Sequence, residues 1–497
     1  MTFPQNFALA LPEAILAVSA LVLLVWGAFQ GKASLAFVTA SAAALVAAAV
    51  AAAVGPQGVA FNGAFAADAA AAFAKVAIYL ASAIALPLSS RWFSTRGEAK
   101  FEFPVLVILA ALGMGITVSA GDLISLYMGV ELQSLALYVL AAFRRDDAKS
   151  SEAGLKYFVL GALSSGLLLY GASLIYGFAG STRFHDIAIA VQAGAGNGVL
   201  FGLVFLICGL AFKVSAAPFH MWTPDVYEGA PTPVVGFFAA APKLAGMVLF
   251  ARAVSDAFPG AVDQWRQVLV VIALASIFVG AFAGLAQKNL KRLWAYSSIA
   301  NVGYAVLGLA AGGEEGAHSM LMFMILYMVD VTGFFACLTA LSRDGRPLET
   351  IDDMAGLIKT RPGLALAMTA FSLSALGLPP FSGFWAKLVL VRAGLEAERY
   401  AVVAAALVTS LLTLFSMTKI WSQAFWKPEP DASAAARSRV PVSGASESPL
   451  LVPVLVLTAL TVLLGVFAEP ALGLCARAAD QLLGRDAYVR AVLEPER

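Results

Sequence analysis

The stretch LAFKVSAAPFHMWTPDVYEGAPTPVVGFFAAAPKLAGM, residues 210–247, decides the fold. Lys213 and Lys243 lie inside apolar runs near its two ends, and prolines at positions 218, 224, 231 and 233 interrupt the segment between them. A charged side chain in hydrocarbon is costly unless it faces a partner or a hydrated cavity. Proline at membrane depth leaves backbone groups that protein or water must satisfy. The stretch therefore predicts a broken membrane helix with a functional site beside it.

The composition is that of a polytopic membrane protein. Hydrophobic residues make up 60% of the 497 residues and charged residues 13%, whereas roughly a quarter of the residues in soluble proteins are charged. The net charge of +1 favours neither a nucleic acid nor an acidic partner. Cys208, Cys337 and Cys475 are far apart, so no iron–sulfur cluster, zinc site or disulfide framework is indicated. No GxGxxG or GxxxxGK[ST] fingerprint indicates a nucleotide site.

The apolar runs predict an all-α protein with about fourteen transmembrane helices, since about 20 apolar residues cross a bilayer. The spans are expected at residues 7–29, 35–54, 70–88, 103–119, 123–143, 153–178, 199–216, 234–251, 268–286, 293–311, 317–341, 364–391, 400–425 and 450–472. The first run lacks a positive n-region and is long enough to span, so we expect a helix and not a cleaved signal. Residues 426–448, rich in Ala, Ser, Pro and Arg, are expected to form a loop before the last helix and tail at 449–497.

Lysine and arginine are concentrated in the loops on one side of this arrangement. That side includes Arg144, Arg145, Lys288 and Arg292, whereas the opposite loops carry few basic residues, such as Arg183. The basic side of a membrane protein is normally cytoplasmic. With an even number of spans, both termini are expected to face outward.

A second interrupted span resembles the first. Lys213 lies just before the break in AFKVSAAPF, and Lys387 lies just after the break in LGLPPFSGFWAK. Interrupted helices in corresponding positions of two halves indicate an inverted repeat with its active elements at the breaks.

Four ionisable residues lie deep in predicted spans. Glu131 is about 10 Å or more from either end of its span, and Lys213 is its expected partner, so that the two groups would titrate as a coupled pair. Lys243, in AAAPKLAGMVLF, has no acidic residue nearby in its own helix, and Lys387 is similar. A buried lysine without a fixed counter-ion can exchange a proton near neutrality. Static ion pairs, or snorkelling of Lys387, are the alternative interpretations.

Other polar residues carry a weaker signal. His220 follows the first break and is either a proton relay or a packing histidine. Lys156 begins its span and either modulates the Glu131–Lys213 pair or snorkels to the surface. Asp330 and Lys75 also lie inside spans, and the sequence leaves their roles open.

Several segments resemble the antiporter-like membrane subunits of respiratory complex I. They are FKVSAAPFHMWTPDVYEGAPTPV, APKLAG, QKNLKRLWAYSSIANVGY, KYFVLGALSSGLLLYG and LPPFSGFWAK, and the resemblance extends over nearly the whole chain. Asn301 departs from the pattern, because relatives often have histidine or glutamine there. An amide can still bind water, but it does not titrate.

The resemblance implies a single transmembrane domain built from two inverted five-helix repeats, at about 103–254 and about 268–425, with broken helices at spans 7 and 12. It also implies a proton-translocating membrane subunit of NADH:quinone oxidoreductase in the bacterial inner membrane, with Glu131, Lys213, Lys243 and Lys387 on the proton path. NADH, FMN, iron–sulfur clusters and quinone are expected on partner subunits, and no cofactor is expected on this chain. The expected partners are the other membrane subunits, the hydrophilic NADH-oxidising arm that they connect to, and lipid.

Two other functions stay open at this stage. Subunits of sodium/proton antiporters share the scaffold, and co-purification with hydrophilic dehydrogenase subunits would separate that function from complex I. A structural spacer with frozen charge pairs is the second alternative. Under it, replacing Lys243 and Lys387 would reduce assembly and leave coupling intact.

Overall fold

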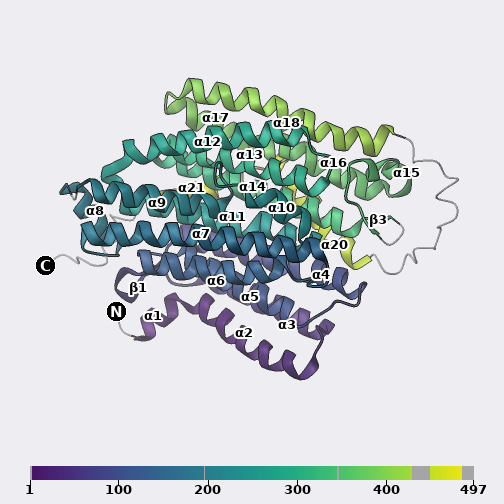
Figure 1. Ribbon diagram of the computed structural model, residues 1–497, viewed down its shortest axis with the longest axis horizontal. Coiled ribbons are helices and arrows are strands. Elements are labelled where there is room, and N and C mark those ends of the chain that lie inside the picture. Colours follow the sequence, from purple (N-terminus) through teal and green to yellow (C-terminus); the bar gives the residue numbers. More distant parts are fainter. Residues whose placement is uncertain (1–2, 195, 344–345, 428–447, 484–497) are drawn as a thin grey trace.

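The computed structural model describes residues 3–194, 196–343, 346–427 and 448–483. Within these ranges it contains twenty α-helices, most of which run side by side along the long axis of the molecule (Figure 1). The all-α polytopic class predicted from the sequence is therefore confirmed.

The first half of the chain forms a series of long helices with short connections. Its elements are α1 (Phe3–Leu9), α2 (Leu11–Gln30), α3 (Leu35–Val54), β1 (Gly58–Ala60), η1 (Phe61–Gly63), β2 (Phe65–Ala67), α4 (Ala69–Ser94), α5 (Glu102–Val118), α6 (Leu123–Ala141), α7 (Ala148–Ala179), α8 (Phe184–Gln192), α9 (Asn197–Val214), α10 (Trp222–Gly229) and α11 (Thr232–Ala257).

The second half continues the bundle and adds two helices after residue 447. Its elements are η2 (Pro259–Ala261), α12 (Val262–Leu285), α13 (Leu290–Ala311), α14 (Gly313–Ala340), β3 (Ser342–Arg343), β4 (Arg346–Pro347), η3 (Asp352–Met354), α15 (Leu357–Thr360), α16 (Pro362–Leu376), α17 (Gly383–Glu396), α18 (Tyr400–Trp426), α20 (Ser448–Val466) and α21 (Glu469–Leu483). The strands pair as β1–β2 and β3–β4 antiparallel hairpins.

Eleven of the described helices are long and apolar enough to cross a membrane. They are α2, α3, α4, α6, α7, α9, α11, α12 with η2, α13, α14 and α18. The bent pair α20 and α21 raises the number to twelve if it makes one span, and α5 and α16 are shorter apolar helices. The chain is therefore a multi-pass membrane protein, and the number of fourteen spans stays a prediction.

Helix α11 forms the centre of the bundle. Every side chain from Thr232 to Val254 is buried, because α4, α5, α9, α13 and α14 all pack against it. A helix that is apolar on every side is stable in the interior of such a bundle. Lys243 lies on this helix, so the surrounding helices remove it from lipid.

Short polar residues set where the site-bearing helices begin. The Asp122 carboxylate accepts a hydrogen bond of 2.6 Å from the Ser125 N–H at the start of α6. The Asn289 amide oxygen accepts one of 3.1 Å from the Arg292 N–H at the start of α13. Such N-caps satisfy backbone donors that have no partner in the first turn. They fix the starting points of the helices that carry Glu131 and Ser298.

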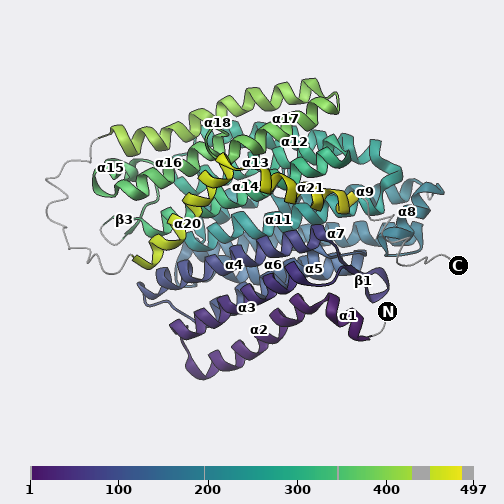
Figure 2. The same cartoon turned by 180° about the vertical axis from the view of Figure 1, so that it is seen from behind.

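The prediction of one continuous helix at residues 450–472 is wrong. Helix α20 ends at Val466, and α21 begins at Glu469 after a bend of 84°. Pro470 explains the break, because proline has no N–H to continue a helical ladder and is favoured in a first turn. The two helices cross the back of the bundle over α14 (Figure 2).

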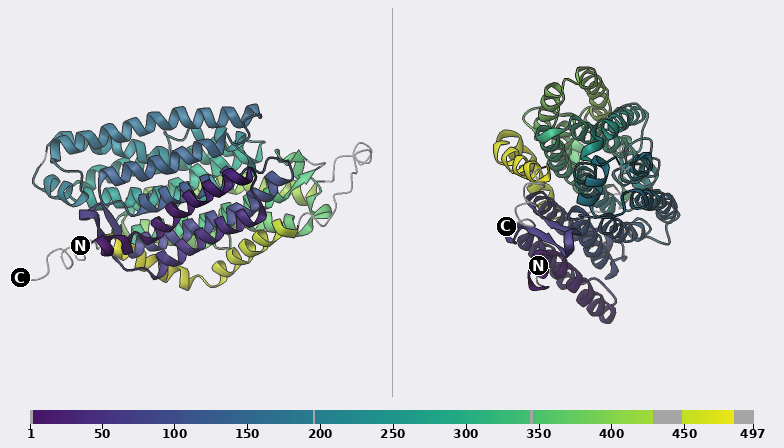
Figure 3. Two further views of the ribbon diagram at one scale, coloured as in Figure 1. Left: turned by 90° about the horizontal axis from the view of Figure 1, so that it is seen from below. Right: turned by 90° about the vertical axis from the view of Figure 1, so that its left-hand side faces the viewer.

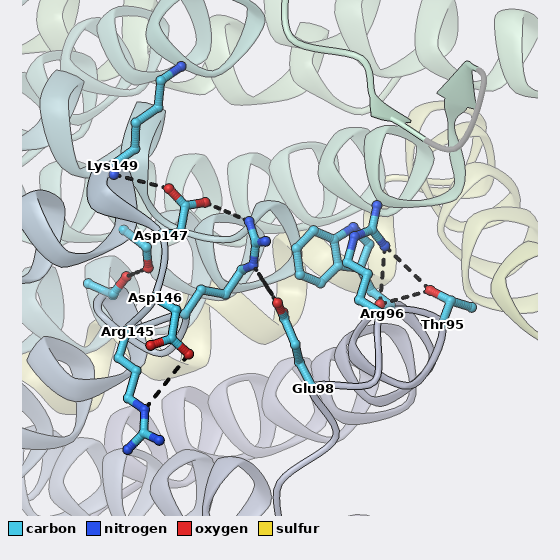
Figure 4. Close-up of polar contacts among 11 residues, drawn as sticks. Thr95, Arg96, Glu98, Arg145, Asp146, Asp147 and Lys149 are labelled. Atoms are coloured by element: carbon cyan, nitrogen blue, oxygen red, sulfur yellow. Dashed lines mark hydrogen bonds and ion pairs between the residues drawn. The ribbon is translucent and has the colours of Figure 1, made fainter.

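One end of the bundle carries a polar cluster that joins the α4–α5 and α6–α7 connections (Figure 4). The Arg144 Nε atom lies 3.1 and 3.0 Å from the two carboxylate oxygens of Glu98, and Arg144 also pairs with Asp147 at 2.6 Å. The guanidinium of Arg96 lies 3.9 Å from the ring centroid of Trp92. Burial, with Arg144 nearby, lowers the pKa of Arg96 from its ordinary value, but an arginine remains charged at neutral pH. This is the basic side predicted to be cytoplasmic.

Several elements were absent from the predicted spans. Helix α8 lies at the end opposite the polar cluster together with α1 and β1, and the N-terminal helices α1, α2 and α3 form one edge of the molecule (Figure 3).

The predicted loop at 426–448 falls largely on residues 428–447, and the predicted tail ends in residues 484–497. Both of these segments lie outside the described residues.

Candidate functional site: a buried line of ionisable residues

The first break brings Glu131 and Lys213 together. Lys213 lies in the last turn of α9, and its Nζ atom is 3.9 Å from the Glu131 Oε1 atom on α6. Ser165 on α7 donates a hydrogen bond to Glu131 and accepts one of 3.3 Å from Lys213. Ser134 accepts a second bond from Lys213 at 3.0 Å. The pairing predicted from the sequence is present, with a hydroxyl group between the two charges.

The position of Lys213 has a backbone cause as well. The last carbonyl groups of a helix carry a partial negative charge, which favours a cation in the last turn. The Lys213 side chain is 7% exposed and that of Glu131 is 23% exposed, so the carboxylate lies nearer to the surface of the chain. The pair therefore connects the interior of the bundle with its outer wall.

Lys243 occupies the interior with hydroxyl partners in place of a carboxylate. It is 1% exposed and donates a hydrogen bond to Ser298 on α13. The Tyr327 hydroxyl on α14 donates a bond of 2.6 Å to the same serine. The ring centroid of Tyr227 lies 5.5 Å from the Lys243 Nζ atom, a favourable position for a cation.

Lys387 lies at the second break, where it contacts the end of α16. Its Nζ atom donates bonds of 2.7 Å to the carbonyl oxygen of Leu376, the last residue of α16, and to the Ser410 hydroxyl on α18. The ring of Tyr304 lies 5.5 Å away. Lys387 therefore caps the C-terminus of a helix, as Lys213 lies in the last turn of α9. This shared placement was not visible in the sequence.

A small polar cavity lies beside Lys387. Its volume is about 10 Å³ and its lining includes Asn301, Tyr327, Asp330 and Lys387. A cavity of this size has room for about one water molecule when it offers polar partners. Since Tyr327 also bonds to Ser298, hydroxyl groups and this cavity connect the surroundings of the two lysines.

The helices that carry Lys213 and Lys243 pack against each other. A Cβ atom added to Gly246 on α11 would lie 2.8 Å from the Cγ1 atom of Val214 on α9. Val214 follows Lys213 directly, and Gly246 lies about one turn beyond Lys243. The two lysines are thus carried by backbone segments in direct contact.

Two of the predicted site residues lie apart from this line. Lys156 is 41% exposed and pairs with Asp225 at 2.7 Å and Glu152 at 2.8 Å, and no contact joins it to Glu131 or Lys213 within the described residues. His220 lies in the break between α9 and α10, and its buried Nδ1 atom has no hydrogen-bond partner in the described part of the chain.

Lys75 forms a separate buried pair near the N-terminus. Its Nζ atom lies 2.8 Å from Glu13 Oε1 on α2, and Tyr79 donates a bond of 3.2 Å to the same oxygen. This pair joins α2 to α4, away from both breaks. The geometry gives it the character of a structural ion pair.

Sequence reasoning missed most of the hydroxyl partners. Ser165, Ser410 and Tyr327 are not singled out by the sequence, and Ser298 stands there only within the segment QKNLKRLWAYSSIANVGY. Their one signal is a hydroxyl group within an apolar helix, and such residues are common at ordinary helix contacts. The partner of Lys243 could therefore not be chosen without the fold.

A long bundle of apolar helices with lysines buried at its interruptions is the class of structure that the comparisons now identify. Residues 120–413 match the family described as NADH:quinone oxidoreductase/Mrp antiporter, transmembrane. NADH-quinone oxidoreductase subunit N from a Caulobacter species is 71% identical over 450 residues, which cover 87% of this chain and 93% of that protein.

Solved structures agree with the family. A chain of respiratory complex I from Thermus thermophilus is 33% identical, with a TM-score of 0.77 and coverage of 94% of this chain and 99% of that one. A chain of the Mrp complex from a Dietzia species is 25% identical, with a TM-score of 0.82 and coverage of 99% and 100%.

The chain belongs to the subunit N family of NADH-quinone oxidoreductase, within the wider NADH:quinone oxidoreductase/Mrp antiporter family. The resemblance expected from the sequence is confirmed, and so is the predicted function as a proton-translocating membrane subunit of complex I.

Proposed function

We propose that protons cross this subunit along the line Glu131, Lys213, Lys243 and Lys387, driven by electron transfer from NADH to quinone in partner subunits. The observation that carries the proposal is the placement of three lysines within one helical bundle, Lys243 fully buried and Lys213 and Lys387 largely enclosed, each beside hydroxyl groups that can pass a proton. An ionisable side chain inside the membrane is by default a sign of a functional site.

The first step is a change in the Glu131–Lys213 pair. At 4 Å, two unit charges interact by about 4 kcal/mol at an effective dielectric constant of about 20. Motion of α6 or α9 that lengthens the 3.9 Å separation removes part of this energy and alters the proton affinity of Lys213. Ser165 bonds to both groups and holds the resting geometry.

The next steps carry the proton across the middle of the bundle. Lys213 and Lys243 exchange charge where α9 and α11 touch at Val214 and Gly246. Ser298 and Tyr327 then lead from Lys243 to the cavity beside Lys387. Hydroxyl groups both donate and accept hydrogen bonds, which is the property that a proton relay needs.

The two inverted five-helix repeats expected from the resemblance are part of the proposal. We propose that α9 with α10 and α16 with α17 are the two broken spans, and that α5 and the α16–α17 pair complete a total of fourteen. Both termini then face outward, opposite the polar cluster of Glu98, Arg144 and Asp147.

The partners follow from the family. We propose that the other membrane subunits cover the Glu131 side of the chain, that lipid covers the exposed apolar residues of α2, α7 and α18, and that the hydrophilic arm is reached through the neighbouring subunits. NADH, FMN, iron–sulfur clusters and quinone belong in this proposal to partner subunits. Here Cys208, Cys337 and Cys475 lie on three different helices, α9, α14 and α21.

Replacing Lys243 by methionine and by arginine tests the route. Methionine removes the charge and keeps the length of the side chain, whereas arginine keeps the charge but cannot release its proton. We expect proton pumping by both variants to fall at least about tenfold in the assembled complex reconstituted into liposomes. NADH oxidation with an artificial electron acceptor serves as the measure of an intact hydrophilic arm.

The arginine variant separates the route from a structural spacer. If Lys243 is a frozen charge, Lys243→Arg pumps normally and Lys243→Met loses assembly. Normal pumping by an assembled Lys243→Met complex contradicts the route directly. The Glu13→Gln/Lys75→Met double variant is the matched control, because it removes a buried lysine outside the line.

A sodium/proton antiporter subunit is the second candidate, favoured by the similarity to the Mrp complex chain. It predicts sodium-dependent proton movement in membranes that lack the dehydrogenase subunits. Co-purification with those subunits, together with pumping that requires NADH and is unaffected by sodium, decides for the first function.

A further inference from the structure

Asp330 is a buried carboxylate that the proposed route does not use. It lies in the middle of α14 and is 2% exposed. Within the described residues, no lysine, arginine or histidine nitrogen comes within 4 Å of it. A buried charge without a paired cation is expensive, so the presence of a carboxylate at this position needs a physical explanation.

Three hydroxyl groups from three different elements surround the carboxylate. Ser374 on α16 donates to Oδ2 at 2.6 Å, and Thr461 on α20 donates to Oδ1 at 2.7 Å. Ser382, in the second break, donates to Oδ1 at 3.4 Å. The three hydroxyl groups also lie 2.7 to 3.3 Å from one another. We call these three residues the hydroxyl cage.

The cage is joined to the start of α17. The Gly383 N–H, at the first residue of that helix, donates a bond of 3.0 Å to the Ser374 hydroxyl. A helix N-terminus carries a partial positive charge, and it lies here on the far side of the serine from the carboxylate. The anionic form of Asp330 is therefore supported by hydrogen bonds and a helix dipole in place of a cation.

Asp330 and Lys387 share one cavity. Both line the space of about 10 Å³ that Tyr327 also reaches, and Tyr327 lies three residues before Asp330, on the same face of α14. Lys387 lies in the second turn of α17, the helix whose first N–H supports the cage. A carboxylate and an amine are thus placed around room for about one water molecule.

We propose that Asp330 exchanges a proton with Lys387 across this cavity. The proton leaves the Lys387 ammonium group, which becomes a neutral amine, and it ends on the Asp330 carboxylate, which becomes a neutral acid. A water molecule in the cavity carries it between them. The cage adapts to either form, because each hydroxyl group can reverse from donor to acceptor.

This inference rests on the proposed function, since it needs Lys387 to carry a proton. It gives Lys387, at the second break, a carboxylate partner in Asp330 that is reached through the cavity and not by direct contact. The competing explanation is that Asp330 is a packing residue that ties α14, α16 and α20 together through its hydrogen bonds.

Asp330→Asn and Thr461→Val separate the two explanations. Asparagine keeps an acceptor oxygen for the cage but cannot take up a proton, and valine removes one cage donor while keeping the carboxylate. We expect assembled Asp330→Asn complex to pump at least about tenfold more slowly than the wild type, with Thr461→Val within about threefold of it. Asp330→Glu, which restores an acid, is expected to recover most of the activity.

An infrared difference spectrum between the resting and the turning-over complex supplies a second readout. A carboxylic acid C=O band that disappears in Asp330→Asn and shifts in Asp330→Glu supports the proposal, because a packing role does not change protonation. If Asp330→Asn fails to assemble, the comparison of wild type with Asp330→Glu still decides, and identical spectra overturn the proposal.

The failures of the two proposals are distinguishable. If assembled Asp330→Asn pumps normally while Lys387→Met does not, Asp330 is not on the path and the route through Lys387 stands. If Lys387→Met pumps normally as well, the route itself is wrong.

Discussion

The two helix breaks hold a lysine in different ways. At the first break, Lys213 has a carboxylate 3.9 Å away and two serine hydroxyls. At the second, Lys387 contacts the last carbonyl of α16 and a serine, while the carboxylate of Asp330 is bonded to the hydroxyl cage. Both lysines sit at a helix C-terminus, so a backbone dipole stabilises each charge. The ionic partner is in contact at one break and set apart at the other.

This difference teaches how the same residue type can serve two purposes. The energy of an ion pair in contact depends on distance, so movement of a neighbouring helix would strongly change the proton affinity of Lys213. Lys387 has no ionic partner within 4 Å among the described residues, and it lines a polar cavity whose contents it can respond to. The first break is suited to receive a conformational signal, and the second is suited to pass a proton on.

The largest expected effect follows from breaking the first pair. Lys213→Met leaves Glu131 without its cation, and Glu131→Gln leaves Lys213 without its anion. We expect each change to cost about 3 kcal/mol, the lower end for a buried pair, because Glu131 is partly exposed. Pumping should fall at least about tenfold in both. The Glu131→Gln/Lys213→Met double variant should regain assembly, measured by native electrophoresis, without regaining pumping. A double variant that pumps contradicts the role of the pair.

A smaller effect on assembly, with a similar loss of pumping, is expected at the second break. Lys387→Met leaves no carboxylate orphaned, because Asp330 keeps its hydroxyl donors. We expect a cost of about 1–3 kcal/mol from the Leu376 carbonyl that loses its donor. The amount of assembled complex should therefore exceed that of Lys213→Met under the same expression conditions. The reverse order would show that the two breaks do not differ as described.

Lys156 should matter less than either break lysine. Its partners Asp225 and Glu152 are near the surface, and exposed ion pairs contribute about 0–1 kcal/mol. Lys156→Met is expected to keep more than about half of the pumping rate in liposomes, since Arg292 continues to pair with Asp225 at 2.6 Å. A loss as deep as that of Lys213→Met would place Lys156 on the route after all.

The smallest effect on pumping is expected at the buried pair outside both breaks. Lys75→Met alone leaves Glu13 buried without a cation, at a cost of about 3–5 kcal/mol, so less complex should assemble. Protons pumped per NADH oxidised should nevertheless equal the wild-type value in the complex that does assemble. Adding Glu13→Gln should restore the yield. A changed stoichiometry in either variant would mean that buried charge, wherever it lies, affects translocation.

The sequence predicted the architecture better than the partners. Apolar length alone located most of the helices, because a bilayer sets that length physically. It did not reveal the bend before Glu469, since an apolar run shows no change of direction, nor the short helix α8. The inverted repeats, the sides of the termini and the total of fourteen spans stay predictions.

The pairing of Glu131 with Lys213 was predictable, because opposite charges at similar depth have few other ways to be neutralised. Ser298 as the partner of Lys243 was not, because it lies 55 residues away in the chain and carries no charge. The hydroxyl groups around Asp330 could not be predicted for the same reason. Its donors come from α16, the break and α20, so their convergence exists in the folded chain alone.

The Thr461 hydroxyl group on α20 has a consequence for the order in which the second break is completed. Thr461 comes late in the chain, and a Cβ on nearby Gly465 would lie 1.8 Å from the carbonyl oxygen of Pro380, so this helix seals the second break by intimate contact. Glu131, Lys213, Lys243 and Lys387 all lie before α20 in the chain, so this helix is the last of these elements to be synthesised. A chain without α20 therefore lacks one donor of the hydroxyl cage and the contact at Pro380, so the second break is complete only when this last helix has docked.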